Sequence, residues 1–354
     1  MRAAVFHEPG KMVVTDVPVP DIEADEILVR VRAASICGTD LRILRYGHFK
    51  LPPGRPRVLG HEVAGDVVEV GSQVTGHAIG DRVSVTPNVG CGHCPRCRAG
   101  LNNMCQDYEA FGVTIDGGFQ EYLRVPGFAL QRGNVFRLLE TLSYAEAALV
   151  EPFSCCYRGQ RAVDVGFEDV VVIIGAGPIG AFHVMLARTA GARKIIVANR
   201  SEARLETAAR LGADVVVTTS RTDLTEVVLA ETDGRGADVV ITAASSPDVQ
   251  AEAVSLLGVH GRVNFFSGLG QGGTVPIDTN KLHYKALTLT GTTGSSNADY
   301  AQCLHLVGDR RVRLDQLVSG TFTLDDIDDA FRHASSGAGM KAMVVFDGEK
   351  EDRP

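Results

Sequence analysis

The first part of the chain consists of short valine-rich runs separated by glycine and proline. Up to about residue 150, such runs include EILVRVRAAS, EVAGDVVEVG and GDRVSVTPN. Short runs rich in β-branched residues and bounded by turn residues are typical of strands. The pattern therefore predicts a β-rich region at the start of the chain.

The pattern changes at about Val163, where apolar strands begin to alternate with helical segments. DVVVIIGAGPIGAFHVMLARTAGA contains a continuous apolar strand, a glycine turn and a helical pattern that ends at glycine. Further short apolar strands follow, separated by segments of helical character: KIIVANR, ADVVVTTS, ADVVITAAS, GRVNFFSG and ALTLTGTT. This alternation predicts βαβ units and a doubly wound parallel sheet.

The end of the chain differs from both regions. LDQLVSGTFTLDDIDDAFRHASSG contains an amphipathic helix preceded by polar capping residues, and KAMVVF is a final strand. A chain of 354 residues is longer than one hydrophobic core usually supports. We expect an α/β protein with a β-rich domain from residues 1–152 and 291–354, and a doubly wound domain from residues 153–290 inserted between them.

The overall composition narrows the class of protein. Apolar residues make up 45% of the chain and charged residues 22%, as in soluble globular proteins. The net charge of −8 and the lack of a long basic run argue against a nucleic-acid partner. The apolar run at the N-terminus is too short for a signal peptide, and no later run reaches membrane-spanning length. We expect a cytoplasmic protein that binds neither membrane nor nucleic acid.

A glycine-rich turn joins the first apolar strand of the second domain to its first helix. The turn has the form G-x-G-x-x-G and consists of Gly175, Ala176, Gly177, Pro178, Ile179 and Gly180. Its glycines permit a tight turn, a close approach of the backbone to a pyrophosphate, and close packing of helix on strand. Free N–H groups at the helix N-terminus favour the anion. The turn therefore predicts a dinucleotide cofactor.

The end of the second strand of this domain indicates which dinucleotide binds. An Asp or Glu at that position usually holds the ribose diol of NAD. This chain has neutral Asn199 there, followed by Arg200 and Ser201, with Arg204 one helical turn later. An arginine and a hydroxyl bind a 2′-phosphate, which a carboxylate would repel. We predict that NADP is preferred over NAD; in the alternative, Glu202 accepts the ribose hydroxyls and NAD is preferred.

Half of the eight cysteines lie in one short segment, residues 91–105. Cys91, Cys94, Cys97 and Cys105 have spacings that suit one tetrahedral zinc ion. In a cytoplasmic protein such a cluster binds metal more often than it forms disulfides. Four thiolates leave no position for a substrate, so we predict a structural zinc in this lobe, with His93 as a bystander.

A second set of metal-binding residue types is spread along the chain. It comprises Cys37 in ICGTD, His61 and Glu62 in VLGHEVAG, and Glu151 in LVEPF. One cysteine, one histidine and a carboxylate are a reasonable ligand set for a catalytic zinc. Spacing alone does not distinguish such a site from ordinary core residues.

Several motifs, in the same order, resemble the zinc-containing alcohol dehydrogenases of the medium-chain dehydrogenase/reductase superfamily. The pattern GHExxGxxxxxGxxV resembles the signature of that family and consists here of Gly60, His61, Glu62, Gly65, Gly71 and Val74. The cysteine lobe, GDRV at 80–83, GGFQEY at 117–122 and the glycine turn extend the resemblance over nearly the whole chain. It implies a GroES-like catalytic domain and a Rossmann domain.

The resemblance also implies the ligands of the catalytic zinc. Glu151 followed by Pro152 is similar to the polyol and threonine dehydrogenase branch of the family. The implied ligands are Cys37, His61 and either Glu62 or Glu151. One thiolate with two carboxylates would make the zinc site net negative, so we expect one carboxylate to bind at a time.

A further residue is implied to move the proton of the substrate hydroxyl. Thr39 matches the Ser or Thr that has this role in the family. The relatives commonly have His three residues later, where this chain has Arg42. Either water replaces the imidazole or Arg42 faces the substrate. With Arg45 and His48 nearby, a phosphorylated substrate is one interpretation, and a solvated polar helix face is the simpler one.

These observations predict a zinc- and NADP-dependent dehydrogenase of a secondary alcohol, with a sugar alcohol or its ketose as the preferred substrate. One alternative is oxidation of L-threonine or a vicinal diol by the same residues, although Arg42 weakens the threonine version. The other is a non-catalytic NADPH-binding protein, against which the intact zinc ligands argue.

The strand ALTLTGTT could pair across a two-fold axis, as in relatives, which implies a homo-oligomer, expected to be a tetramer.

Overall fold

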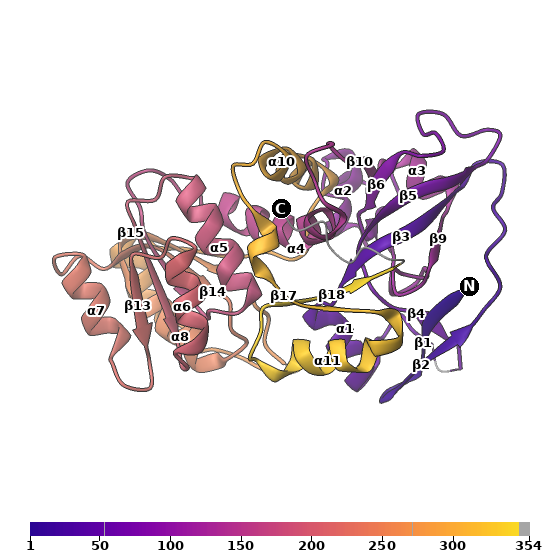
Figure 1. The fold of residues 1–354 in the computed structure, drawn as a ribbon. Coiled ribbons are helices and arrows are strands. Elements are labelled where there is room, and N and C mark those ends of the chain that lie inside the picture. Colours follow the sequence, from indigo (N-terminus) through magenta and orange to yellow (C-terminus); the bar gives the residue numbers. More distant parts are fainter. Residues whose placement is uncertain (53, 271, 347–354) are drawn as a thin grey trace. The chain divides into compact units, whose positions relative to one another are not determined.

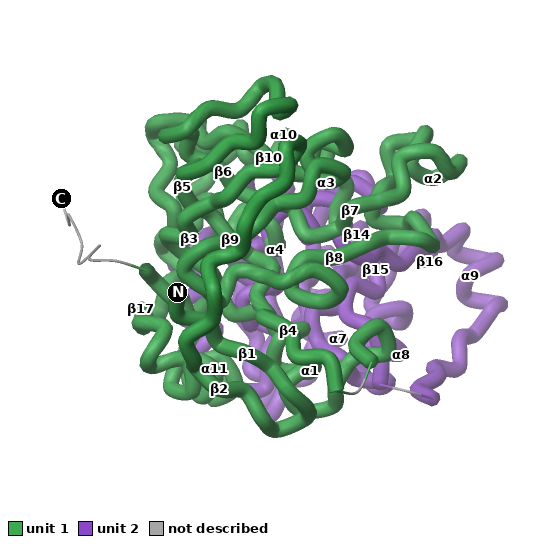
Figure 2. The backbone as a smooth tube through the Cα atoms, turned by 90° about the vertical axis from the view of Figure 1, so that its right-hand side faces the viewer, with its two compact units in different colours: residues 1–152, 295–354 green, residues 153–294 purple. Residues whose placement is uncertain are grey.

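The computed structural model describes residues 1–52, 54–270 and 272–346 (Figure 1). The chain divides into two compact units, which Figure 2 shows in different colours. Unit 1 consists of Met1–Pro152 and Ser295–Pro354, and unit 2 consists of Phe153–Gly294. The chain returns to unit 1 at residue 295, slightly later than the predicted boundary at residue 291.

Unit 2 contains one parallel sheet with the strand order β13-β12-β11-β14-β15-β16. Figure 1 labels β13, β14 and β15 of this sheet. Its strands are β11 (Val170–Ile174), β12 (Lys194–Asn199), β13 (Val215–Thr218), β14 (Ala237–Thr242), β15 (Leu257–Phe265) and β16 (Thr288–Gly291). Its helices are α5 (Pro178–Thr189), α6 (Ala203–Arg210), α7 (Leu224–Glu231), α8 (Pro247–Ser255) and α9 (Thr279–Lys285). This is the strand order of a Rossmann fold, so the predicted doubly wound sheet is confirmed.

Both faces of this sheet are buried, which explains why its strands are continuously apolar. Val170 and Val172 of β11 pack in one cluster with residues of α7 and α8. Val171 and Ile173 pack in a second cluster with residues of α5 and α6. Successive residues of a strand point to opposite faces, so a sheet covered on both sides needs apolar residues at every position.

Unit 1 is built mainly from antiparallel strands. One sheet has the order β10-β6-β5-β3-β18-β17, with β9 also paired to β3, a second has the order β2-β1-β4, and β7 pairs with β8. The strands are β1 (Arg2–Glu8), β2 (Lys11–Asp16), β3 (Ile27–Ser35), β4 (Arg57–Val58), β5 (Glu62–Val70), β6 (Arg82–Val85), β7 (Asn88–Val89), β8 (Glu109–Ala110), β9 (Tyr122–Val125), β10 (Val135–Arg137), β17 (Val318–Phe322) and β18 (Lys341–Val345). Strands from the two ends of the chain therefore share one sheet.

Among the described residues of unit 1, three helices have ten or more residues and the others are shorter. The helices of this unit are α1 (Gly38–Tyr46), α2 (Pro95–Arg98), α3 (Gly127–Gln131), α4 (Tyr144–Arg161), α10 (Asn297–Gly308) and α11 (Ile327–Ser336), with 3-10 turns at η1 (Asn102–Met104), η2 (Leu314–Leu317) and η3 (Leu324–Asp326). Helix α4 has 18 residues and continues from unit 1 into unit 2. Neither α4 nor any other helix in the described part of the chain is long and apolar enough to cross a membrane.

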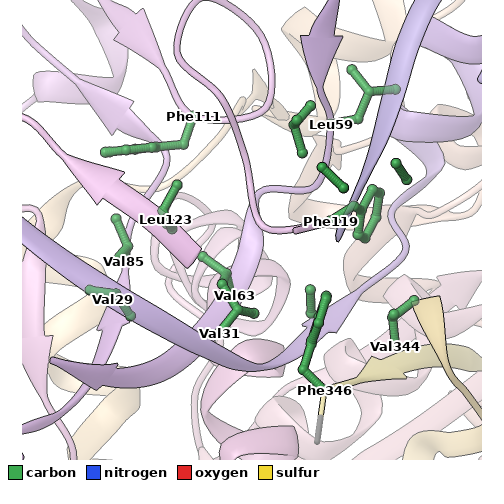
Figure 3. Close-up of a cluster of buried hydrophobic side chains, with 14 of the residues drawn as sticks. Val29, Val31, Leu59, Val63, Val85, Phe111, Phe119, Leu123, Val344 and Phe346 are labelled. Atoms are coloured by element: carbon green, nitrogen blue, oxygen red, sulfur yellow. The ribbon is translucent and has the colours of Figure 1, made fainter. Parts of the chain in front are cut away.

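The core of unit 1 surrounds the central strand β3. Figure 3 shows the buried side chains of Val29, Val31, Val63 and Val344 in this cluster, from β3, β5 and β18. Ser35 at the end of β3 pairs with Glu62 at the start of β5 on one side, and with Met343 of β18 on the other. The end of β3 therefore lies between the first residue of β5 and the middle of β18.

Candidate functional site

Cys37 and His61 are placed by backbone turns next to the central strand of unit 1. Cys37 follows β3 and is the N-cap residue of α1. His61 precedes β5 and follows Gly60, whose φ is +90°. A Cβ at Gly60 would lie 2.8 Å from Cδ1 of Phe119, so a side chain at this position would be both strained and crowded.

The structure brings Cys37, His61 and Glu62 together. Their candidate ligand atoms lie within 4.8 Å of one another; His61 and Glu62 are buried and Cys37 is half-buried. A thiolate, an imidazole and a carboxylate are the donors that zinc prefers in catalytic sites, where three protein ligands leave one position open. The donor set therefore fits zinc.

Asp40 organises this group from the first turn of α1. Its side chain is fully buried and accepts hydrogen bonds from the N–H groups of Cys37, at 2.9 Å, and Gly60, at 3.3 Å. Its Oδ1 also lies 3.3 Å from Nδ1 of His61. A carboxylate on one ring nitrogen orients a histidine ligand and leaves the other nitrogen for a metal.

The negative charge of the site changes the protonation of His61. Burial by itself would lower the pKa of His61, but the negative groups of Asp40 and Cys37 outweigh burial and raise this pKa well above its ordinary value. The surroundings of His61 thus favour a positive charge on the imidazole itself.

Lys341 balances the charge of Glu62. Its Nζ lies 2.6 Å from Oε2 and 2.9 Å from Oε1 of Glu62, and it also donates to the carbonyl of Ile36 at 2.9 Å. Both side chains are almost completely buried, at 5% and 0% exposure. Burial opposes the lysine charge, but Glu62 and Cys37 raise the pKa of Lys341 above its ordinary value. Glu62 is therefore held by a buried cation beside the candidate metal site.

The remaining residues predicted for this site have different environments. Glu151 lies buried in α4, and the group of three candidate ligands in the described residues does not include it. Thr39 is half-buried in the first turn of α1. Arg42 is exposed on the same helix. Burial lowers the pKa of His48, and the positive charge of Arg42 lowers it further.

The four cysteines of residues 91–105 form a compact group. The sulfur atoms of Cys91 and Cys97 lie 4.0 Å apart, and those of Cys94 and Cys105 lie 3.9 Å apart. A zinc ion with bonds of about 2.3 Å to four sulfurs requires edges of about 3.8 Å, so this group fits zinc. His93 is exposed, and its Nδ1 lies 3.0 Å from the carbonyl of Cys91.

Backbone N–H groups donate hydrogen bonds to sulfur atoms of this cluster. The N–H of Cys91 donates to the sulfur of Cys105 at 3.3 Å, that of Cys94 to Cys91 at 3.3 Å, and that of Cys97 to Cys94 at 3.4 Å. Hydrogen bonds from the backbone of His93 and Cys94 lower the pKa of the Cys91 thiol to about 6. Burial raises the pKa of the Cys97 thiol to about 12, so without a metal the loop favours a thiolate at Cys91 but not at Cys97.

In unit 2, the glycine turn has the geometry of a dinucleotide site. Gly175 has a φ of +113°, and a Cβ at Gly180 would lie 1.9 Å from the carbonyl oxygen of Gly175, so both positions require glycine. Gly177 is the N-cap residue of α5, and Pro178 occupies the first turn before Ile179. The turn brings the N-terminus of α5 to the end of β11, which fits a bound pyrophosphate.

Asn199 connects this turn to the segment that follows β12. Its Oδ1 accepts a hydrogen bond from the N–H of Ala176 at 3.3 Å. Its Nδ2 donates to the carbonyl of Ser201 at 2.9 Å and to the hydroxyl of Ser201 at 3.2 Å. An uncharged amide therefore stands where a carboxylate would hold the ribose diol of NAD.

The polar and charged residues after β12 differ in their exposure and contacts. Arg200 and Ser201 are exposed, whereas Arg204 is half-buried. A Cβ at Gly177 would lie 3.3 Å from Nη1 of Arg204, so this guanidinium lies against the glycine turn. Glu202 forms an ion pair with Arg221, from the loop after β13.

Asp40, Lys341 and Arg221 were not among the residues predicted from the sequence. Asp40 could have been found, because a carboxylate three residues after Cys37 has the spacing of a helix capping box. Lys341 and Arg221 show no comparable local signal; each is a single cation near the end of a strand. Their roles depend on contacts with residues distant in the sequence.

Two protein-family models match the chain. The model described as alcohol dehydrogenase GroES-like domain matches residues 23–131, and the one described as zinc-binding dehydrogenase matches residues 178–309. The first match lies in unit 1 and includes both groups of candidate metal ligands, but not Glu151. The second begins at Pro178 in the glycine turn and continues into unit 1.

Known proteins are similar along nearly the whole chain. The L-threonine 3-dehydrogenase of Aeromonas salmonicida is 32% identical over 94% of this chain and 95% of its own. The sorbitol dehydrogenase of Bacillus subtilis is 32% identical over 94% and 93%. A structure described as a zinc-binding dehydrogenase from Sinorhizobium meliloti, bound to NADP, has a TM-score of 0.90 and 32% identity over 98% and 99%. The chain therefore belongs to the zinc-binding alcohol dehydrogenases of the medium-chain dehydrogenase/reductase superfamily, which are oxidoreductases.

Proposed function

We propose that the protein is a zinc- and NADP-dependent dehydrogenase that interconverts a secondary alcohol and its ketone, with a sugar alcohol as the substrate. The observation that carries this proposal is the buried group of Cys37, His61 and Glu62, held by Asp40 and Lys341. The same chain has a Rossmann unit with a glycine turn suited to a dinucleotide.

The residues of unit 1 have distinct parts in this reaction. Cys37, His61 and either Glu62 or Glu151 would hold a zinc ion, which would supply the Lewis acidity that lowers the pKa of a substrate hydroxyl. Asp40 would orient His61, and the hydroxyl of Thr39 would accept the substrate proton while passing its own proton to water. Bound NADP would supply the hydride acceptor.

The ion pair with Lys341 bears on which carboxylate binds the metal. A thiolate with two free carboxylates would give the zinc site a net negative charge and weaken it as a Lewis acid. Lys341 offsets the charge of Glu62, at 2.6 Å. This arrangement favours Glu62 as the carboxylate kept off the metal while Glu151 or substrate is bound.

The turn after β12 supports NADP as the preferred cofactor. Asn199 is neutral, Arg200 and Ser201 are exposed beside it, and Glu202 is paired with Arg221. Arg204 lies against Gly177, which favours a place near the pyrophosphate end of the site. The related protein from Sinorhizobium meliloti is bound to NADP.

Two kinds of relative favour different substrates for this protein. The similarity to sorbitol dehydrogenase favours a polyol, and that to L-threonine 3-dehydrogenase favours an amino acid with a secondary hydroxyl. Threonine and polyol dehydrogenases both commonly have His where this chain has Arg42, so Arg42 weakens the threonine version but is not itself a polyol signal. Oxidation of L-threonine or a vicinal diol is the second candidate.

Zinc analysis and a substrate panel test the proposal. Purified protein should contain two zinc ions per chain and should reduce NADP with sugar alcohols at a higher kcat/KM than with L-threonine, simple diols or polyol phosphates. A highest kcat/KM with L-threonine would replace the polyol by the second candidate. One zinc per chain without turnover of any substrate would instead support a non-catalytic NADPH-binding protein.

We also propose that the protein is a homo-oligomer, with a tetramer preferred and a dimer as the alternative. In the described residues, β16 is paired on one side only, with β15, and forms an edge of the sheet of unit 2. An unpaired strand edge readily pairs with a second copy. Light scattering of the purified protein should report four subunits, and a monomer would contradict the proposal.

A further inference from the structure

A second arginine lies beside the segment proposed to bind the 2′-phosphate. β12 and β13 are parallel, and Asn199 at the end of β12 pairs with Thr218 at the end of β13. The residues that follow these strands therefore emerge at the same edge of the sheet. Arg200 comes one residue after β12, and Arg221 comes three residues after β13.

Three contacts hold these two segments together. The N–H of Thr219 donates to the carbonyl of Asn199 at 3.0 Å. The hydroxyl of Ser220 donates to the carbonyl of Arg200 at 3.1 Å. The guanidinium of Arg221 forms an ion pair with the carboxylate of Glu202. The loop after β13 is thus fastened directly to the proposed cofactor-specificity segment.

The Arg221–Glu202 pair is accessible to a ligand. Arg221 is 71% exposed and Glu202 is 57% exposed. Exposed ion pairs contribute little to stability, because water screens them and ordering the side chains costs entropy. A phosphate carries more charge than a carboxylate and accepts several charge-assisted hydrogen bonds from a guanidinium. A 2′-phosphate can therefore displace Glu202 from Arg221 at small cost.

We propose that Arg221 is a specificity-determining residue that binds the 2′-phosphate of NADP together with Arg200, and that Glu202 occupies Arg221 while the cofactor is absent. This inference rests on the proposed NADP preference. It gives Glu202 the role of an internal anion that competes with the phosphate. It also explains how a carboxylate is tolerated next to the phosphate: Arg221 neutralises it.

Arg221 adds a second exposed cation beside Arg200. Arg204, by contrast, is half-buried and lies against Gly177 in the glycine turn. Without Arg221, the exposed segment would have the single charge of Arg200 opposed by that of Glu202. Arg221 changes the local balance from neutral to positive.

Calorimetric titration of the zinc-loaded enzyme with NADP and with NAD tests this inference without requiring a substrate. Wild-type enzyme should bind NADP more tightly. Arg221→Ala should weaken NADP about tenfold and leave NAD within about twofold, because it removes a charge-assisted contact to the phosphate alone. Glu202→Gln should tighten NADP about threefold, since the competing anion is removed.

A matched control is available in the same unit. Arg188 forms an exposed ion pair with Asp214 at 2.7 Å, away from the turn after β12. Arg188→Ala should leave both affinities as in wild type. This control separates the loss of a cation at the proposed site from a general loss of charge.

Different outcomes contradict different statements. Tighter binding of NAD than of NADP by wild type would overturn the cofactor preference on which the inference rests. If wild type prefers NADP but Arg221→Ala keeps the same preference, or weakens both cofactors equally, only the role of Arg221 is wrong. Weaker NAD binding by Glu202→Gln would show that Glu202 accepts the ribose hydroxyls, which overturns its role as an internal anion.

Discussion

The two candidate metal-binding groups of unit 1 are constructed in different ways. The four cysteines belong to one loop, residues 91–105, and backbone N–H groups of that loop donate to their sulfurs. Cys37, His61 and Glu62 come from two strand ends, and a carboxylate and an ammonium group outside the ligand set hold them. The first group is held by contacts within one loop, whereas the second depends on the assembled sheet.

This difference corresponds to two kinds of chemistry. Four thiolates saturate a tetrahedral ion, so the loop can bind zinc only to stabilise structure. Cys37, His61 and one carboxylate would leave room for a further ligand, and the charges of Asp40 and Lys341 would adjust the strength of the site. Substitutions in the first group should affect stability, and those in the second should affect turnover or charge balance.

The largest effect is expected from Cys37→Ser, because Cys37 is the thiolate of the proposed catalytic zinc. Turnover should fall by at least about a thousandfold, in line with the loss of a metal that activates the substrate. Zinc content should fall from two to one per chain, while NADPH binding by fluorescence stays near wild type.

Cys303→Ala is the matched control, since Cys303 is a buried cysteine of α10 that belongs to neither group. It should keep both zinc ions and most of the turnover. Near-native turnover by Cys37→Ser would show that the catalytic ligand set is wrong at this residue.

For the cysteine loop we predict a loss of stability. Cys94→Ser breaks the closed zinc site, and loss of a structural zinc removes several kcal/mol of folding free energy. Denaturant unfolding should shift to lower concentration, and light scattering should report fewer assembled subunits. Activity should decline in proportion to the remaining assembled protein. If the specific activity of the folded oligomer fell as much as in Cys37→Ser, the loop would not be merely structural.

A smaller effect is expected from Lys341→Met, which leaves Glu62 as an unpaired buried charge. Removing one partner of a buried ion pair costs about 3 kcal/mol, and urea unfolding of zinc-free protein should show this loss. In zinc-loaded protein the loss should be smaller, because the released carboxylate can bind the metal. The kcat should fall as Glu62 competes with substrate.

The double variant Lys341→Met with Glu62→Gln is the control for this prediction. It removes both charges, so it should recover part of the lost free energy of unfolding. Equal losses for Lys341→Met with and without zinc would indicate that Glu62 does not reach the metal.

Much of the fold could be predicted from the sequence, because it depends on short-range patterns. The strands of unit 2 are continuous apolar runs, and the structure has β11 to β16 where these runs occur. In unit 1 the valine-rich runs correspond to β3, β5 and β6. The return of the chain to unit 1 lies at 295 instead of 291, within the glycine- and serine-containing segment 291–296, in which no single residue marks the boundary.

In the candidate site, too, the parts that depend on local patterns could be predicted from the sequence. The spacing of Cys91, Cys94, Cys97 and Cys105 and the glycine turn are local patterns, and the structure brings each set together. His61 and Glu62 are adjacent in the chain, but their proximity to Cys37 was expected only from the family resemblance. The choice between Glu62 and Glu151 could not be made from charge alone.

By itself the sequence determined the strand and helix pattern, the closed cysteine site and the glycine turn, since each depends on residues a few positions apart. The tertiary structure decided which charges meet. Glu62 and Lys341 are 279 residues apart and face each other because β5 and β18 flank β3, and Glu202 reaches Arg221 because β12 and β13 end side by side. Such pairings depend on strand order and register, which no local pattern encodes.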